Sequence, residues 1–400
     1  MHKRIRVLFM DHYPDIGGGQ KTLLTYLANF PKKNINCYVV CGHEEGSFTK
    51  ELQKLDLPVF KVRFNESNIR INRTSENTKI RKDFPYFLSN LPLFVKSSFK
   101  IAKIIKINNI DIIYANTTKT ACFGAFASML TSKPLIYRAS NDRFFSNHGW
   151  IDYVVCNQTK KILACSDFVA SSFKEWFWKV KTVYPPIDFE ELTRNLSKES
   201  IDKIRKQYRI SNNAFVVVQI GCLRRVKRHV DLLLSTAQII KSGNPRIMLL
   251  FVGSDSQGKE INIKRELIKI AKELNIWKHI IFTGYKKDVG SILKASDLLV
   301  VPSLTETFGR VIVEALYLEV PVIASNTGAI PEIIKNGETG YLFEPQNVKA
   351  LKDCIRKVLE NYNKAKQLAQ KGRRYVKIRF SLESVLKKNI DIFSELVTKR

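Results

Sequence analysis

The sequence predicts an α/β protein with two parallel sheets, and three observations lead to that fold class. Short runs rich in Val, Ile and Phe recur along the 400 residues without alternating with polar residues, as expected of strands buried on both faces. Longer stretches of helical periodicity separate these runs, which is the order of a parallel α/β fold. The length suits two domains of about 150–200 residues each.

The predicted strands form two series. The first is Ile5–Met10, Cys37–Cys41, Val59–Val62, Ile110–Ala115, Leu135–Arg138 and Lys161–Cys165. The second is Phe215–Ile220, Met248–Val252, Ile280–Phe282, Leu298–Val301, Val322–Ala324 and Gly340–Phe343. Predicted helices include Lys259–Leu274, Val348–Tyr362 and a last one over Ser381–Val397.

The break between the two series lies near Pro185 and Pro186, because proline disfavours both helix and central strand. We therefore expect domains at 1–182 and 183–379, joined by a linker at about 183–190. The C-terminal helix, at about 380–400, is a segment that can pack back on the first domain.

The composition bears on the partners and the compartment of the protein. The chain carries 66 Lys and Arg against 37 Asp and Glu, a net charge of +29 that is spread over both halves. Such a field attracts nucleic acid, an anionic membrane face or phosphorylated substrates, and charge alone does not choose among them. Apolar runs are too short for a spanning helix or a signal peptide. Seven scattered cysteines without metal-ligand spacing predict reduced thiols and a cytoplasmic protein.

Gly17, Gly18 and Gly19 follow the first predicted strand and precede a helix predicted over Gln20–Phe30. A glycine turn at this place exposes backbone N–H groups at a helix N-terminus, where anions are favoured. The triplet is neither a Walker loop nor a GxGxxG motif, and a flexible turn explains it equally well.

A more specific pattern covers Pro302–Leu316. A loop after the strand carries Glu306, and a helix is predicted to begin near Phe308, which places Glu314 about two turns inside it, roughly 9 Å from its start. Two carboxylates so spaced can bind the sugar and ribose hydroxyls of a nucleotide sugar, while N–H groups between them hold its diphosphate. The alternative is two acidic residues favoured by the helix dipole.

The spacing Glu306-x7-Glu314, with Phe308 and Gly309 between, resembles the signature of retaining GT-B glycosyltransferases of family GT4. Further segments resemble that family's motifs in the expected order, namely Gly221–Lys227, Phe282–Tyr285, Pro321–Ser325, Pro331–Ile334 and Asn336–Gly340. The resemblance is dense over about 215–345 and thinner over 1–190. It implies two Rossmann-like domains facing each other across a deep cleft, the first on the acceptor side and the second binding the donor.

The resemblance also implies roles. Glu306 and Lys227 would be catalytic, the first binding hydroxyls of the transferred sugar and the second neutralising the departing diphosphate. The donor would further contact Gly18, Gly19, Arg224, Arg225, Tyr285, Thr307, Phe308, Gly309, Arg310, Val311 and Glu314. The acceptor side would include Gly17, Ser140 and Asn141. His12, which follows the first strand near the glycine turn, and Asn116, which ends a strand facing the expected cleft, are added because of their positions; the alternative for Asn116 is that it only caps a turn. Front-face attack would retain the anomeric configuration, with no metal and no cofactor.

Two departures from the family pattern stand out. Cys222 occupies a position where the family often has Arg, and Arg224 or Arg225 either supplies that charge or is a solvated surface side chain. The strand at Leu135–Arg138 is not followed by the family's usual His. Either Ser140, Asn141 or Arg138 replaces it, or the acceptor chemistry differs, or activity is weak.

A membrane partner is suggested by residues 61–106, which are basic and interrupted by aromatic side chains. Within them Phe94, Val95, Phe99, Ile101, Ala102 and Ile105 fall on an apolar side, and Lys96, Lys100 and Lys103 form a basic stripe. A sheet-covering helix with a solvated lysine face explains the same pattern. Trp176-Phe177-Trp178 is a second interfacial candidate, or simply core.

The sequence thus predicts a hexosyltransferase that builds a lipid-linked cell-surface glycan, such as lipopolysaccharide, capsule or teichoic acid, at the inner face of the plasma membrane. A nucleic-acid-binding protein is disfavoured because the sequence lacks an RNP motif, a zinc finger and a helix-turn-helix. A nucleotide-sugar-binding relative with weak activity, or an epimerase or phosphorylase of the same fold, stays open. The sugar, the base, the acceptor and the oligomeric state do not follow from the sequence.

Overall fold

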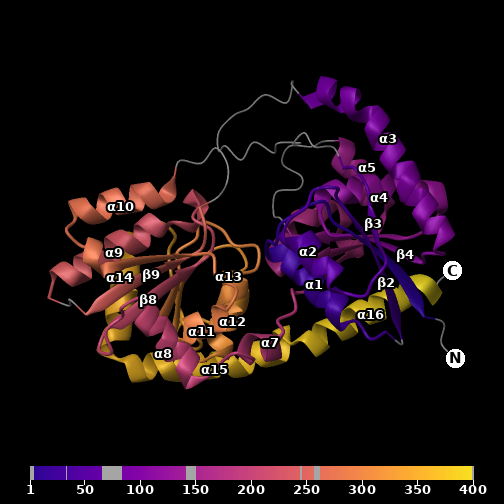
Figure 1. The fold of residues 1–400 in the computed structure, drawn as a ribbon. Helices are drawn as coiled ribbons and strands as arrows, with labels where there is room; N and C mark the ends of the chain where they lie inside the picture. Colours follow the sequence, from indigo (N-terminus) through magenta and orange to yellow (C-terminus); the bar gives the residue numbers. More distant parts are fainter. Residues whose placement is uncertain are drawn as a thin grey trace. The chain divides into compact units, whose positions relative to one another are not determined.

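The computed structural model describes residues 4–32, 34–64, 83–140, 150–243, 246–255 and 262–398. The chain divides into two compact units, the first formed by Met1–Pro186 with Val385–Arg400 and the second by Ile187–Ser384. Each unit contains one sheet with helices packed on it (Figure 1). The strand pairings within both sheets are parallel, which confirms the predicted fold class.

The first sheet has the order β3-β2-β1-β4-β5-β6-β7. Its strands are β1 Ile5–Met10, β2 Ile35–Cys41, β3 Val59–Lys61, β4 Ile112–Ala115, β5 Leu135–Ala139, β6 Thr159–Ala164 and β7 Val180–Thr182. Its helices are α1 Gly18–Asn29, α2 Ser47–Gln53, α3 Asp83–Ile107, α4 Thr118–Thr131, α5 Trp150–Gln158, α6 Asp167–Ala170 and η2 Ser171–Lys179. All the strands predicted for this half are confirmed to within a few residues, and only the short edge strand β7 was not predicted.

The second sheet has the order β10-β9-β8-β11-β12-β13. Its strands are β8 Phe215–Ile220, β9 Ile247–Val252, β10 Ile280–Gly284, β11 Leu298–Val301, β12 Val322–Ser325 and β13 Tyr341–Phe343. The helices in this half are α7 Phe189–Thr193, α8 Lys198–Gln207, η3 Arg225–Lys227, α9 His229–Lys241, α10 Ile263–Glu273, η4 Trp277–His279, α11 Val289–Lys294, α12 Arg310–Tyr317, α13 Ile330–Ile333, α14 Val348–Glu360 and α15 Tyr362–Phe380. The predicted strands are again confirmed.

The last helix, α16 Leu382–Thr398, contributes to the core of the first unit. The ring of Phe393 packs against Phe30 and Tyr114, with centroid distances of 5.7 and 6.1 Å. On the same helix, Glu395 forms ion pairs with Lys161 and Lys181. Burying the apolar face of this helix stabilises the fold by roughly 25 cal/mol for each Å² of apolar surface removed from water.

Helix α3 is a sheet-covering helix in its C-terminal half. Ile101, Ala102 and Ile105 are buried in the core of the first unit, as the helical periodicity predicts. Phe99 was expected on the same apolar side but is 54% exposed, so that part of the prediction is wrong. Successive residues of a helix are rotated by about 100°. Phe99 therefore lies on the same face as Lys96, Lys100 and Lys103, whose side chains are exposed.

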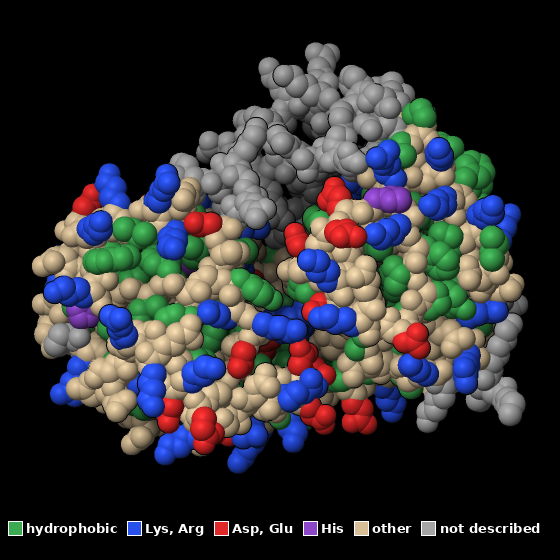
Figure 2. Space-filling model, in the orientation of Figure 1, with side chains coloured by type: hydrophobic (Ala, Val, Ile, Leu, Met, Phe, Trp, Pro, Cys, Tyr) green, Lys and Arg blue, Asp and Glu red, His purple; other side chains and the backbone are tan. Residues whose placement is uncertain are grey.

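Among the residues that the structure describes, no helix is long and apolar enough to cross a membrane. Figure 2 shows Lys and Arg side chains spread over this face of both units rather than gathered in one patch. On the face shown, the basic charge is therefore distributed over both units, as its even spread along the sequence predicts.

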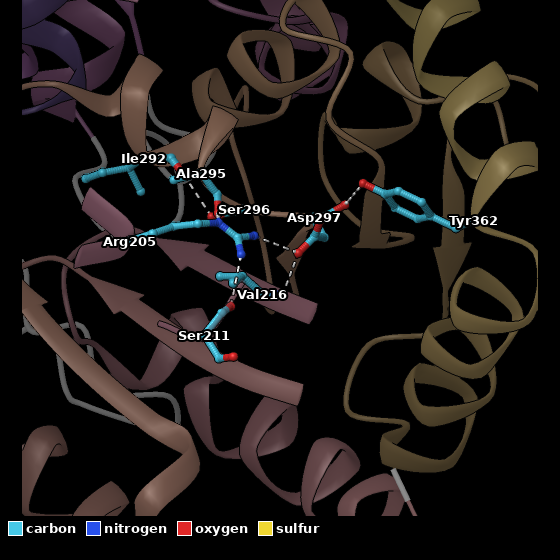
Figure 3. Close-up of polar contacts among 8 residues, drawn as sticks. All are labelled: Arg205, Ser211, Val216, Ile292, Ala295, Ser296, Asp297 and Tyr362. Atoms are coloured by element: carbon cyan, nitrogen blue, oxygen red, sulfur yellow. Dashed lines mark hydrogen bonds and ion pairs between the residues drawn. The ribbon is translucent and has the colours of Figure 1, made fainter. Parts of the chain in front are cut away.

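Parallel strands end at one edge of a sheet, so loops that are distant in sequence meet there. In the second unit this carboxyl edge receives the loops that follow β8, β9, β10, β11 and β12, and these carry most of the predicted donor residues. The opposite, amino edge of the same sheet is closed by a polar network around Asp297 and Arg205 (Figure 3).

Candidate functional site

The carboxyl edge of the second sheet brings Lys227 and Glu306 together. The Lys227 Nζ atom donates to Glu306 Oε1 at 2.5 Å, although 79 residues separate the two along the chain. The side chains are 27% and 14% exposed, so a ligand can reach both while each is largely shielded from water. Charges in such a partly buried place interact more strongly than on an open surface.

The turn that carries Lys227 is anchored on its far side to the sheet. The Gln219 side chain, at the end of β8, donates from Nε2 to the Lys227 carbonyl oxygen at 2.7 Å. The next residue, Arg228, has a left-handed φ of 51°, and its guanidinium binds both carboxylate oxygens of Asp231, at 2.8 and 2.7 Å. A left-handed non-glycine residue is strained, and this bidentate ion pair stabilises it.

The loop that carries Glu306 is held equally firmly. The Ser303 Oγ atom donates to Glu306 Oε1 at 2.8 Å, and the Glu306 carbonyl accepts from the Ala329 N–H at 2.8 Å. A Cβ atom on Gly328 would lie 2.3 Å from that carbonyl oxygen, and the φ of Gly328 is +56°. Gly328 is therefore needed for the loop after β12 to approach the Glu306 backbone this closely.

The two loops also bond directly to each other. The Leu304 N–H donates to the Val226 carbonyl at 2.8 Å, one residue before Lys227. The backbone thus sets the distance between the two loops, and the ion pair of Lys227 and Glu306 forms between elements that are already joined.

Helix α12 begins later than the sequence predicts. It starts at Arg310 rather than near Phe308. Gly309 precedes it with a φ of +89°, a left-handed conformation that glycine adopts without strain. Glu314 consequently lies little more than one turn inside the helix, about 6 Å from its start, and the expected spacing of two turns is wrong. The Glu314 carboxylate is 5% exposed and forms an ion pair with Arg310 at 3.4 Å.

The other predicted donor residues of the second unit lie around this edge. Thr307 and Val311 are partly buried, and Phe308 is 5% exposed against Phe380. Tyr285, after β10, is 66% exposed. Arg224 is partly buried, whereas Arg225 is exposed and pairs with Glu266 of α10 at 3.5 Å. Arg224 or Arg225 was expected to supply the positive charge that the family's arginine brings at the position of Cys222. Arg225 uses its charge in an ion pair within the protein.

The glycine turn of the first unit is organised by Asp11. This carboxylate is completely buried at the end of β1 and accepts from Gln20 Nε2 at 3.0 Å and from Asn116 Nδ2 at 2.6 Å. Burial raises the pKa of Asp11, whereas these hydrogen bonds act to lower it. Gln20 also accepts from the Gly17 N–H at 3.1 Å.

The helix predicted from Gln20 already begins at Gly18, with Gly17 as its N-cap. Gly18 and Gly19 are therefore first-turn residues, and the Gly17 N–H is used internally. Asn116, expected to face the acceptor, is 2% exposed and bonds to Asp11 and to the Gly19 carbonyl. Asn116 therefore supports the glycine turn, the alternative to an acceptor contact.

The remaining acceptor-side candidates differ in accessibility. His12 is half-buried and shares a hydrogen bond of 3.0 Å with Thr117 Oγ1; burial, and then the nearby Lys119 charge, lower its pKa to about 3. Ser140 is partly exposed directly after β5, and Asn141 lies outside the described residues. Arg138 is 1% exposed and donates to the Val183 carbonyl at 2.5 Å, so it holds the end of the first unit rather than replacing a histidine.

Sequence reasoning missed the residues that support these groups. Ser303, Gln219 and Asp231 hold Glu306 and the Lys227 turn, and Asp11 and Gln20 hold the glycine turn. One signal was available, because a buried polar residue at the end of a predicted strand needs a partner. Gln219 and Asp11 both stand at such places.

Comparison with known families decides the class of enzyme. The model described as glycosyl transferases group 1 matches residues 200–375, and the model of Glycosyltransferase Family 4 matches residues 16–191. The chain belongs to the family 4 glycosyltransferases. The resemblance drawn from the motifs is thereby confirmed, and the protein is a transferase.

Relatives and solved structures agree with this family. N-acetyl-alpha-D-glucosaminyl L-malate synthase of Bacillus anthracis is 28% identical over 218 residues, 54% of this chain and 54% of its own, so the match spans about half of that relative. UDP-Gal:alpha-D-GlcNAc-diphosphoundecaprenol alpha-1,3-galactosyltransferase of Escherichia coli is 21% identical over 374 residues, 90% of this chain and 89% of its own. The structure of Anabaena HepE in complex with UDP and glucose has a TM-score of 0.80 at 24% identity, covering 98% of this chain and 100% of that chain. The fold is GT-B.

Proposed function

We propose that this glycosyltransferase moves a sugar from a nucleotide-sugar donor to a growing, lipid-linked cell-surface glycan, with retention of anomeric configuration. The observation that carries the proposal is the contact between Lys227 and Glu306 at the carboxyl edge of the second sheet. The names of the relatives supply the substrate classes, since the E. coli enzyme is named for a UDP sugar and a diphosphoundecaprenol acceptor, and HepE was solved with UDP.

In this proposal the two charges act on different parts of the donor. Lys227 binds the diphosphate and neutralises the negative charge that grows on it as the sugar leaves, which is the form of electrostatic stabilisation that contributes most to many enzymes. Glu306 accepts hydrogen bonds from sugar hydroxyls and so orients the anomeric carbon. The first N–H groups of α12 supply a further positive end for phosphate.

Retention follows in the proposal from attack on the face that the diphosphate leaves. A retaining glycosidase instead places two carboxylates about 5 Å apart across the scissile bond, one of them as nucleophile. Here the carboxylate of Glu306 is bonded to a lysine and to Ser303, an arrangement suited to binding rather than to nucleophilic attack.

We further propose that no metal takes part, because the Lys227 ammonium can supply the charge that a divalent cation would otherwise bring. Turnover should then persist in the presence of excess EDTA. Loss of turnover in EDTA that returns with added Mg²⁺ or Mn²⁺ would contradict this part of the proposal.

The membrane part of the proposal rests on exposed aromatic and basic side chains of the first unit. Phe177 and Trp178 are 74% and 62% exposed, while their neighbour Trp176 is 5% exposed and belongs to the core. Lys96, Lys103 and Lys106 on α3 are also exposed. Aromatic side chains favour the membrane interface, and each lysine near an anionic surface contributes about 1 kcal/mol.

Flotation with anionic vesicles at low salt tests this association. Wild type should float with the vesicles, and the double variant Phe177→Ser and Trp178→Ser should float less. Trp277→Ser, an exposed aromatic of the second unit, is the matched control and should behave as wild type. Failure of wild type to bind would remove the membrane proposal and leave the transferase proposal intact.

Donor binding is tested by thermal shift with UDP-, GDP- and ADP-sugars. One selective stabiliser would identify the donor, because a ligand that binds only the folded state raises the unfolding temperature. Absence of any shift, together with absence of sugar transfer to a lipid-linked acceptor, would overturn the proposed function. Sugar isomerisation without transfer would favour the epimerase alternative.

A further inference from the structure

We propose that Ser303 is a positioning residue that holds Glu306 for the sugar once Lys227 has turned to the donor's diphosphate. This inference rests on the proposed function and adds to it a residue that binds neither the sugar nor the phosphate.

The first observation is that two donors share one oxygen. Lys227 Nζ and Ser303 Oγ both donate to Glu306 Oε1, at 2.5 and 2.8 Å. In the unliganded protein the lysine and the carboxylate neutralise each other, so neither partly buried charge lacks a partner. A ligand hydroxyl can then approach Oε2 of the same carboxylate.

The second step is an argument about what donor binding would change. A diphosphate carries more negative charge than a carboxylate, so it attracts the Lys227 ammonium away from Glu306. The carboxylate side chain is only 14% exposed and would then lose its strongest partner. Ser303 is the donor that stays, because its hydroxyl belongs to the same loop and carries no charge for the diphosphate to attract.

The third observation is that Ser303 itself is immobilised. Its side chain is buried, with the residue 1% exposed, and its carbonyl accepts from Ser325 Oγ at 2.6 Å. The neighbouring Leu304 carbonyl accepts from Thr327 Oγ1 at 2.9 Å. The hydroxyl is thus delivered from a backbone that β12 and its loop hold in place, which is what a residue that orients another needs.

The test compares a nucleoside diphosphate with its sugar conjugate by titration calorimetry. UDP, GDP and ADP, each with its glucose conjugate, are the probes, and the pair that binds wild type is carried forward. Ser303→Ala should weaken the sugar conjugate about tenfold, the size expected for a hydrogen bond to a charged group. The affinity for the diphosphate alone should stay within about twofold, because Lys227 is unchanged.

Thr327→Val is the matched control, since it removes one hydrogen bond to the same loop without touching Glu306. Thr327→Val should change the affinities for the diphosphate and for the sugar conjugate by equal factors, or change neither. The sugar-specific loss in Ser303→Ala, with a parallel fall in kcat and an unchanged unfolding temperature, would support the inference.

Equal weakening of both ligands by Ser303→Ala, or no weakening, would overturn it. If wild type bound no nucleotide sugar at all, the proposed function would fail first and the inference with it. The two failures are therefore distinguishable.

Discussion

The two edges of the second sheet each carry an ion pair of similar burial, but the two pairs differ in their other hydrogen-bond partners. At the carboxyl edge Lys227 and Glu306 are 27% and 14% exposed; at the amino edge Arg205 and Asp297 are 19% and 25% exposed. Lys227 and Glu306 meet through their side-chain tips. Arg205 and Asp297 meet as well, at 3.3 Å, but both also bind backbone groups (Figure 3).

The amino-edge pair works as a structural junction. Asp297 Oδ2 accepts from the Val216 N–H at 2.7 Å, and the Asp297 carbonyl accepts from the Tyr362 hydroxyl at 3.2 Å. Arg205 donates to the carbonyls of Ala295 and Ser211. These contacts connect α8, β8, the start of β11 and α15, so both charges are committed to contacts within the protein.

The presence of an ion pair therefore does not by itself mark a functional site. A functional site is marked by charges that can exchange partners. The Lys227 and Glu306 tips can leave each other while Gln219, Leu304 and Ser303 keep both loops in place, whereas Arg205 cannot leave Asp297 without releasing backbone groups.

The largest expected effect comes from removing a charge at the carboxyl edge. Lys227→Ala and Glu306→Gln should each lower kcat by roughly 10²-fold or more, because charge placed for the transition state is lost. Unfolding temperatures should change little. Steady-state sugar transfer measures the first effect and calorimetry the second. Near-normal turnover in both variants would show that the pair is structural, like the one at the amino edge.

The reverse pattern is expected at the amino edge. Asp297→Asn keeps the shape but removes the charge that binds Arg205 and the Val216 N–H, so it should lower the free energy of unfolding by about 2–3 kcal/mol. Denaturant titration measures this, and kcat of the folded variant should stay within about twofold. A fall in kcat without a fall in stability would show that the pair at the amino edge serves catalysis and is not a structural junction.

Acid should destabilise the protein through two histidines, His229 and His12, whose pKa values are lowered by burial. Burial, and then the Lys227 charge, lower the pKa of His229 to about 3, and His12 in the first unit is lowered to a similar value. The unfolded chain takes up a proton near pH 6.5 that the folded chain refuses until about pH 3, so stability is complete above 6.5 and is lost as the pH falls through that window. Each histidine should cost about 2 kcal/mol by pH 5.

His229→Leu separates this contribution from the rest. Thermal unfolding at pH 7 and pH 5 should show a smaller drop for His229→Leu than for wild type, because the unfolded variant has no imidazole at this position to take up a proton. An identical drop in both would mean that His229 is protonated in the folded protein at pH 5.

The smallest effect is expected for Tyr362→Phe. It removes one hydrogen bond to the Asp297 carbonyl and should lower stability by about 1 kcal/mol without changing kcat. Burial, and then the Asp297 charge, raise the pKa of the Tyr362 phenol, so it stays protonated over the working pH range. Denaturant titration at pH 7 and pH 9 should give the same small difference from wild type.

Strands and helices were largely predictable because burial on both faces of a parallel sheet is recorded in each strand's own composition. Strand β4 shows this, since Ile112–Ala115 is completely buried over its whole length. The edge strand β7 escaped because Val180–Thr182 is short and only half-buried. The position of Phe99 was wrong for a related reason, since periodicity orients a helix only to within about one row of side chains.

The sequence by itself determined the fold class, nearly all strands, and the motif residues that identify a family 4 glycosyltransferase, because each of these depends only on residues close together in the chain. Only the tertiary structure decided which side chains meet. It placed Lys227 on Glu306 across 79 residues, turned Asn116 inward to Asp11, and revealed Ser303 as the second donor to Glu306. The reason is that these contacts depend on which strands become neighbours in a sheet, and no local pattern of residues records that order.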